Sequence, residues 1–243
     1  MVSRELVRLG GLAGIGVGLF ILPFAASDGM IGGLFAPEVL HGASGNAWLA
    51  RIAARPELAR IAIALPICGF AFMLVVGVTL FRLVADRHWG ATLGIVGYLV
   101  GVPIAVSAFV SATSLVWTAL DGPTTLAVAG VTAELHRFML VNLAVGPFFI
   151  IVVGNTCMSL AAWRVAVLPR WLCIWGLVNG AIMALGIGSL WWPGLQAAQV
   201  GGPLTMLWFM TTGVVLLKQA ATRTSRGNVA VKQPVAPGGS AAG

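Results

Sequence analysis

Uncharged apolar runs alternate with short charged or proline-containing turns along most of the chain. Each run is long enough for one α-helix to cross the ~30 Å hydrocarbon core of a bilayer, which takes ~20 apolar residues. The pattern predicts six transmembrane helices, over residues 9–27, 58–82, 91–114, 138–163, 171–192 and 203–221. We therefore expect an all-α fold, a polytopic transmembrane helical bundle that forms one domain over residues 1–221.

The carboxyl-terminal segment, residues 222–243, has a different composition. It consists mainly of Ser, Gly, Pro, Ala and scattered basic residues. Such a segment has too few large apolar side chains to offset the entropy lost on folding. We expect it to be a disordered cytoplasmic tail.

Composition supports a membrane protein. Apolar residues make up 59% of the chain and charged residues 9%, whereas soluble domains have ~45–50% and ~25%. The net charge of +7 does not indicate nucleic-acid binding, because the basic residues separate apolar runs instead of forming one patch on a soluble face. The expected environment is the lipid bilayer, and a membrane-protein partner or a second copy of the chain stays open.

The first run has two interpretations, a transmembrane helix or a cleavable signal sequence. The run over residues 9–27 is longer than the ~7–15-residue apolar core of a signal sequence. Gly10, Gly14 and Gly18 recur every four residues, which places them on one helical face suited to close packing. Both features favour a retained helix.

The fifth run carries the clearest packing signal. Gly176, Gly180, Ala184 and Gly188 also recur every four residues. Small residues at this spacing form a groove into which a neighbouring helix can settle closely. This predicts that the helix packs inside a bundle.

Basic residues indicate the orientation of the bundle. With a cytoplasmic amino terminus, ten basic residues lie in inner segments: Arg4, Arg8, Arg82, Arg87, Arg164, Arg170, Lys218, Arg223, Arg226 and Lys232. Four lie in outer segments: Arg51, Arg55, Arg60 and Arg137. This distribution obeys the positive-inside rule and predicts a multi-pass protein of the inner (cell) membrane with both termini in the cytoplasm.

Polar side chains inside the predicted helices are the main candidates for a binding site. They are Asn142, Asn155, Asn179, Ser107 and Ser111. One interpretation is that they bridge neighbouring helices, with ~0.6 kcal/mol gained per hydrogen bond on average. The other is that they line a polar path or a ligand pocket.

A second group lies in the predicted outer segments: His41, Glu134, His136 and Arg137. Their spacing matches no metal-binding motif, so we predict no metal site. An ion pair between Glu134 and either Arg137 or His136 is the preferred interpretation.

No ionisable residue lies at the centre of a predicted helix. Intramembrane charges usually mark a functional site, because burying one in the bilayer costs at least ~2.5–3.5 kcal/mol. We therefore predict no catalytic residue and no cofactor, and favour a non-enzymatic role that the sequence does not assign. Two alternatives stay open: a carrier or permease for a small neutral or apolar compound, and a structural or regulatory partner of another membrane protein.

Three features together resemble a known family. They are the Leu168-Pro169-Arg170-Trp171-Leu172 turn leading into a glycine-rich fifth helix, the long first outer loop, and the arginine-bearing amino terminus. The chain resembles uncharacterised bacterial six-helix membrane proteins grouped as a domain of unknown function. The resemblance covers most of the chain up to the tail and implies the six-helix fold, but no substrate or catalytic residue.

Overall fold

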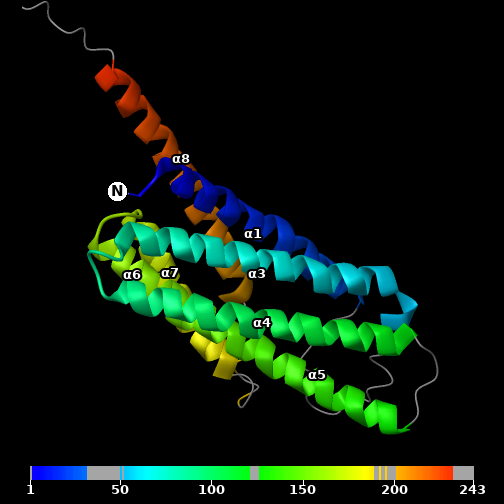
Figure 1. Ribbon diagram of the computed structural model, residues 1–243. Coiled ribbons are helices and arrows are strands. Elements are labelled where there is room, and N and C mark those ends of the chain that lie inside the picture. The colour runs from blue at the N-terminus through cyan, green and yellow to red at the C-terminus, as the bar shows by residue number, and fades with distance from the viewer. Residues whose placement is uncertain are drawn as a thin grey trace, which may run out of the picture.

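The computed structural model describes residues 2–31, 50, 52–120, 126–188, 192, 195 and 201–231. The regular structure of these residues is helical, with no strand among them. The elements are α1 (Arg4–Ile31), α3 (Pro56–Val84), α4 (Gly90–Leu120), α5 (Leu126–Pro147), η2 (Phe148–Asn155), α6 (Thr156–Arg164), α7 (Arg170–Gly188) and α8 (Gly201–Val231). The predicted all-α class is confirmed (Figure 1).

Six stretches of these helices are long and apolar enough to cross a membrane. They are Arg4–Pro23, Pro56–Val84, Gly90–Ser114, Arg137–Arg164, Arg170–Gly188 and Gly201–Thr222. This agrees with the predicted number of crossings. The fourth stretch combines the end of α5 with η2 and α6, so one crossing is built from three consecutive helical segments.

Several helices continue beyond the predicted crossings. Helix α5 begins at Leu126, ahead of the predicted crossing that starts at residue 138, and α8 continues to Val231, past the predicted boundary at 221. The apolar spans themselves begin at Arg137 and end at Thr222. Hydrophobicity therefore located the apolar spans. Before Arg137, the Ala and Leu residues that follow Leu126 are good helix formers and lengthen α5 beyond its span.

η2 is a π-helix that begins directly after Pro147. Proline has no backbone N–H and cannot donate the usual hydrogen bond to the preceding turn. The ladder then continues with wider spacing, as is common where a π-bulge interrupts a helix. This segment ends at Asn155, which places that side chain in the bundle interior.

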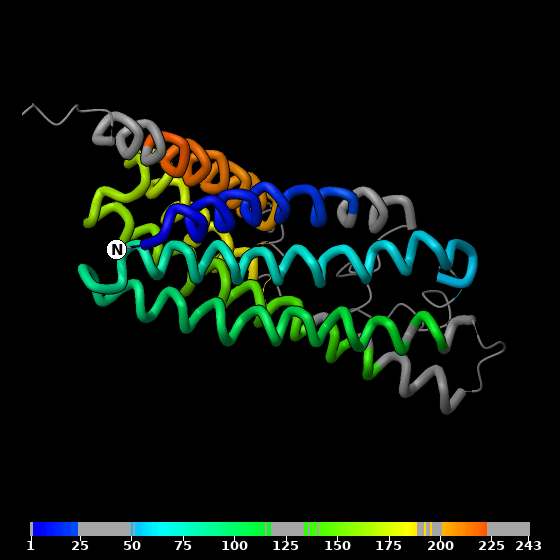
Figure 2. Tube along the Cα trace, turned by 45° about the horizontal axis from the view of Figure 1, so that its top comes forward, coloured from blue at the N-terminus to red at the C-terminus, as the bar shows by residue number. Residues whose placement is uncertain are grey.

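The six spans pack as a closed ring. Helix α1 contacts α3 and α8, α3 contacts α4, and α4 contacts the fourth span through α5, η2 and α6. Helix α7 then contacts η2, α6 and α8, which returns the ring to α1. Figure 2 shows the resulting elongated bundle along the Cα trace.

The chain's amino terminus lies at the same end of the bundle as two turns (Figures 1 and 2). These turns connect α3 to α4 over residues 85–89 and α6 to α7 over residues 165–169. Val2, Arg87, Val167 and Gln219 of α8 line one common hollow there. The two predicted inner turns therefore lie at one end of the bundle with the amino terminus.

The glycines of α1 lie against two neighbouring helices. A Cβ atom added at Gly10 would collide with Thr79 of α3, and one at Gly18 would collide with Met210 of α8. At Gly14 it would lie 2.7 Å from the backbone Cα of Gly213 in α8. The first and last spans therefore touch through their backbones.

The small residues predicted to form one packing groove on α7 lie in different environments. Gly176 lies against Ser159 and Trp208, and Gly180 lies against Thr156. Ala184 is exposed, contrary to the expectation of one continuous packing face, and a Cβ at Gly188 would meet Leu195 at 3.0 Å. The reason is geometric. Four residues turn an α-helix by ~40° more than one full turn, so residues spaced by four gradually move to a different side of the helix.

Candidate functional site

A small apolar cavity lies between the six spans, and we call it the central cavity because all of them line it. Its volume is about 130 Å³, and all of its exposed lining is apolar. Every span contributes to the wall: Ile21 from α1, Phe70 and Met73 from α3, Phe109 from α4, Leu143 from α5, Ile150 and Ile151 from η2, Met183 from α7, and Gly202 and Met206 from α8. The cavity is therefore formed by all six spans together.

Six buried polar side chains lie on the spans that form this cavity. We call them together the polar cluster: Tyr98, Asn155, Ser159, Asn179, Thr205 and Thr212. Each of these residues is at most 1% exposed. Burial this complete is costly for polar groups unless they are hydrogen-bonded.

Two hydrogen bonds organise the polar cluster. The Tyr98 hydroxyl of α4 donates to Oδ1 of Asn155, and Nδ2 of Asn179 in α7 donates to the Thr205 hydroxyl of α8. Thr205 Oγ1 itself donates to the Gly201 carbonyl at 2.8 Å. Because this uses the hydroxyl proton, Thr205 accepts from Asn179, which fixes the orientation of the amide.

Four buried atoms of the polar cluster have no hydrogen-bond partner among the described residues. They are Asn155 Nδ2, Ser159 Oγ, Asn179 Oδ1 and Thr212 Oγ1. They offer one amide donor, one amide acceptor and two hydroxyls. Unpaired groups of this kind are rare in protein interiors, so they mark where a polar group of another molecule could bind.

The cavity and the polar cluster use neighbouring turns of the same helices. Ile151 of the cavity precedes Asn155 by four residues, and Met183 of the cavity follows Asn179 by four. In α8, Thr205 is adjacent to Met206. A molecule in the cavity is thus about one helical turn from the unpaired amide atoms.

Glycines make room for the large side chains around the polar cluster. A Cβ at Gly77 of α3 would collide with the Tyr98 ring, and one at Gly154 would come within 3.2 Å of it. Tyr98 also packs edge-on against Phe209. The missing side chains let the tyrosine lie fully inside the bundle with its hydroxyl on Asn155.

Trp208 occupies a similar position between α7 and α8. Its indole Nε1 donates to the Leu172 carbonyl at 2.9 Å, and a Cβ at Gly176 would lie 2.8 Å from the same nitrogen. Leu172 lies in the first turn of α7, and a carbonyl oxygen has two lone pairs, so it can accept from the indole as well as from the helix. Gly176 therefore leaves room for a buried tryptophan of α8 to bond to the backbone of α7.

The Asn and Ser residues predicted as candidates lie in two separate parts of the bundle. Asn142 of α5 donates to Ser107 of α4 at 3.3 Å, and Ser111 donates to the Ser107 carbonyl at 2.9 Å. These three residues are only half-buried and do not belong to the polar cluster. Asn155 and Asn179 do belong to it, and like Asn142 each bonds to a neighbouring helix.

The predicted outer group is only partly described. Arg137 Nη1 lies 2.6 Å from Glu134 Oε1, as an exposed ion pair one turn apart within α5. His41 lies outside the described residues, and so does the side chain of His136. Within the described part of the chain, no three His, Cys, Asp or Glu side chains are grouped as metal ligands.

Of the polar cluster, only Asn155 and Asn179 were among the candidates from the sequence; Tyr98, Ser159, Thr205 and Thr212 were not. Threonine is common in transmembrane helices because its hydroxyl can bond to its own backbone, as Thr211 does to Leu207. The sequence signal that could have found the two threonines is the spacing of Thr205, Trp208 and Thr212, which places three polar side chains on one face of α8.

These features define the class of the protein: a helical bundle with six apolar spans and an uncharged polar core. Residues 7–220 match the family described as Domain of unknown function (DUF4386), and the chain belongs to that family. This confirms the family resemblance inferred from the sequence. Comparison with curated proteins and with solved structures finds no match.

A double-mutant cycle tests the central hydrogen bond of the polar cluster. We expect Tyr98→Phe to lower the free energy of unfolding by ~1–2 kcal/mol, because it leaves both groups of the Asn155 amide unpaired. In the Asn155→Leu background, the same change should cost less or become stabilising. Unfolding in detergent measures the four variants, and equal costs in the two backgrounds would show that the residues are not coupled.

Proposed function

We propose that the bundle binds one small, uncharged and mainly apolar molecule in its central cavity, and that it acts as a carrier or permease for compounds of this kind. The observation that supports this most is the apolar cavity to which all six spans contribute, with the unpaired amide atoms of Asn155 and Asn179 about one turn away. Binding sites of membrane carriers commonly lie between helices of the bundle.

The chemistry of the wall supports a neutral ligand. Neither the cavity nor the polar cluster contains a charged side chain, and nothing there would compensate the cost of a buried ion. An apolar cavity of ~150 Å³ is known to hold benzene or xenon, so about 130 Å³ suits a molecule of that size. The unpaired amide and hydroxyl groups favour a ligand with one hydrogen-bonding group attached to an apolar body.

The same features favour binding over catalysis. The polar cluster consists of amides, hydroxyls and a phenol, and acid–base catalysis at neutral pH usually relies on His, Asp, Glu or Lys. Amides and hydroxyls can recognise a ligand without transferring a proton to it. A non-enzymatic role therefore agrees with the composition of the site.

Ligand binding can be tested with benzene and benzyl alcohol. We expect both to bind saturably to the purified protein in detergent, with protein-free micelles as the background. Gly202 lines the cavity, and a Cβ there would meet no atom within 4 Å. Gly202→Leu should therefore fill part of the cavity and weaken binding by about tenfold or more, which is ~1.4 kcal/mol or more. Ligand-observed NMR measures the affinity.

Val214→Leu is the matched control, because it adds apolar volume on an exposed position of the same helix. It should leave the affinity unchanged. The proposal fails if neither probe binds above the micelle background, or if both substitutions reduce binding equally.

We also propose that the protein lies in the cell (inner) membrane with both termini in the cytoplasm. The support is the distribution of basic residues, ten against four, together with the position of the amino terminus beside two turns, one containing Arg87 and the other flanked by Arg164 and Arg170. A green fluorescent reporter fused after Gly243 should fluoresce, and an alkaline phosphatase fused there should be inactive. The opposite pattern would reverse the orientation.

A further inference from the structure

A second, larger hollow lies at the end of the bundle that holds the amino terminus. Its volume is about 630 Å³, and it opens outward between the start of α1, the end of α3, the turn after α6, and α8. Volumes of ~300–1,000 Å³ are typical of ligand sites. This end hollow does not include any residue of the central cavity.

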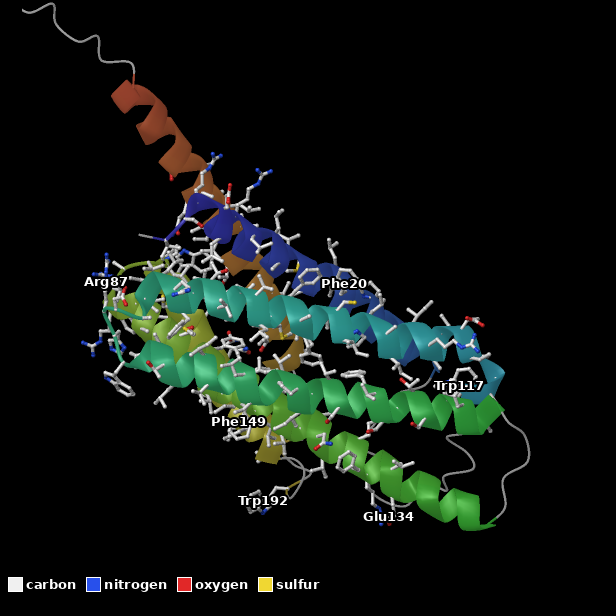
Figure 3. All side chains as sticks on the ribbon, in the orientation of Figure 1. Phe20, Arg87, Trp117, Glu134, Phe149 and Trp192 are labelled. Atoms are coloured by element: carbon white, nitrogen blue, oxygen red, sulfur yellow. The ribbon has the colours of Figure 1, made fainter. Side chains whose placement is uncertain are left out.

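Two arginines line the end hollow from different parts of the chain. Arg4 comes from the first turn of α1 and Arg87 from the turn after α3, and Figure 3 labels Arg87 at this end of the bundle. Within the part of the chain that the structure describes, neither arginine is paired with a carboxylate. The ion pairs found there are Arg60 with Glu57 and Arg137 with Glu134.

The surrounding charges add to the positive potential. Among the residues whose side chains the structure describes, seven basic ones belong to this end: Arg4, Arg8, Arg82, Arg87, Arg164, Arg170 and Lys218. Two acidic residues, Glu5 and Asp86, belong to it as well. A concave surface with one dominant sign of charge concentrates counter-ions at its mouth.

The part of the wall formed by Ala166, Val167 and Gln219 is held in a defined conformation. Gln219 Nε2 of α8 donates to the Val167 carbonyl at 2.6 Å, and the Ala166 and Val167 amides donate to Trp163 and Ala162 at 3.1 and 3.0 Å. Ala166 has φ of 56°, in the left-handed region that non-glycine residues seldom adopt. Such a conformation persists where surrounding contacts fix it, and this is common at ligand sites.

We propose that the end hollow binds a phosphate-bearing anion, with the guanidinium groups of Arg4 and Arg87 as its main ligands. The planar guanidinium matches phosphate oxygens with two parallel hydrogen bonds. Val2, Leu83 and Val165 give the same hollow an apolar side suited to the glycerol and acyl portion of a phospholipid. The shared chemistry is the phosphate monoanion or dianion, supplied either by a phospholipid headgroup or by a soluble phosphate.

Thermal unfolding in uncharged detergent tests the proposal. The ligands are phosphatidylglycerol, phosphatidylcholine as the zwitterionic control whose choline cation balances the phosphate charge, and inorganic phosphate. Wild type should gain thermal stability with phosphatidylglycerol at concentrations where phosphatidylcholine has little effect. Replacing both arginines, Arg4→Gln with Arg87→Gln, should reduce the apparent affinity by about tenfold or more, because two charge-assisted contacts are lost.

The matched control replaces Arg164 and Arg170 with Gln. These exposed arginines belong to the same end of the bundle but do not line the hollow. The control should respond to ligand like wild type. Midpoints without ligand should agree among all three proteins, which shows that folding is preserved.

Inorganic phosphate distinguishes the two sources. A stabilisation by millimolar phosphate that depends on Arg4 and Arg87 would identify a site for soluble phosphates, whereas a response to phosphatidylglycerol alone would identify a lipid headgroup site. The proposal is wrong if wild type responds to neither ligand, if the Arg4 and Arg87 variant still responds like wild type, or if the control loses the response equally.

Discussion

Close contact between helix backbones is the constraint on which the rest of this structure depends. In a bilayer, lipid chains are as apolar as leucine, so helices associate through tight packing and hydrogen bonds instead of the hydrophobic effect. Gly14 meets Gly213 where α1 packs on α8, and Gly97 of α4 meets the backbone of Gly154 in η2. A Cβ at Gly97 would lie 2.6 Å from the Gly154 nitrogen. These contacts close the ring of spans.

Closing the ring creates both parts of the candidate site. Large side chains such as Tyr98 and Trp208 fill the interior only because facing glycines leave space for them. Where six helices converge, Pro147 and the π-helix after it move the fourth span out of regular α-helical register. The apolar cavity lies beside this irregular segment, and the polar cluster begins at its last residue, Asn155.

The apolar spans were predictable from the sequence because they depend on one local property, the length of an uncharged run. Residues Asn155 and Asn179 were also identifiable as buried polar groups. Their separation from Asn142 was not, because it depends on which helices are neighbours in the ring. The helical extension before Arg137 follows from helix propensity, and the pairing of Asn179 with Thr205 follows from a tertiary contact. Hydropathy contains neither kind of information.

The most direct test of this account compares the free energies of unfolding, in detergent, of three glycine-to-alanine variants. Gly14→Ala and Gly97→Ala should each lose ~1–3 kcal/mol, because the new Cβ would overlap a facing backbone. Gly202→Ala should change by less than ~0.5 kcal/mol, since nothing lies within 4 Å of its added Cβ. Equal effects at all three positions would contradict a bundle closed by backbone contact.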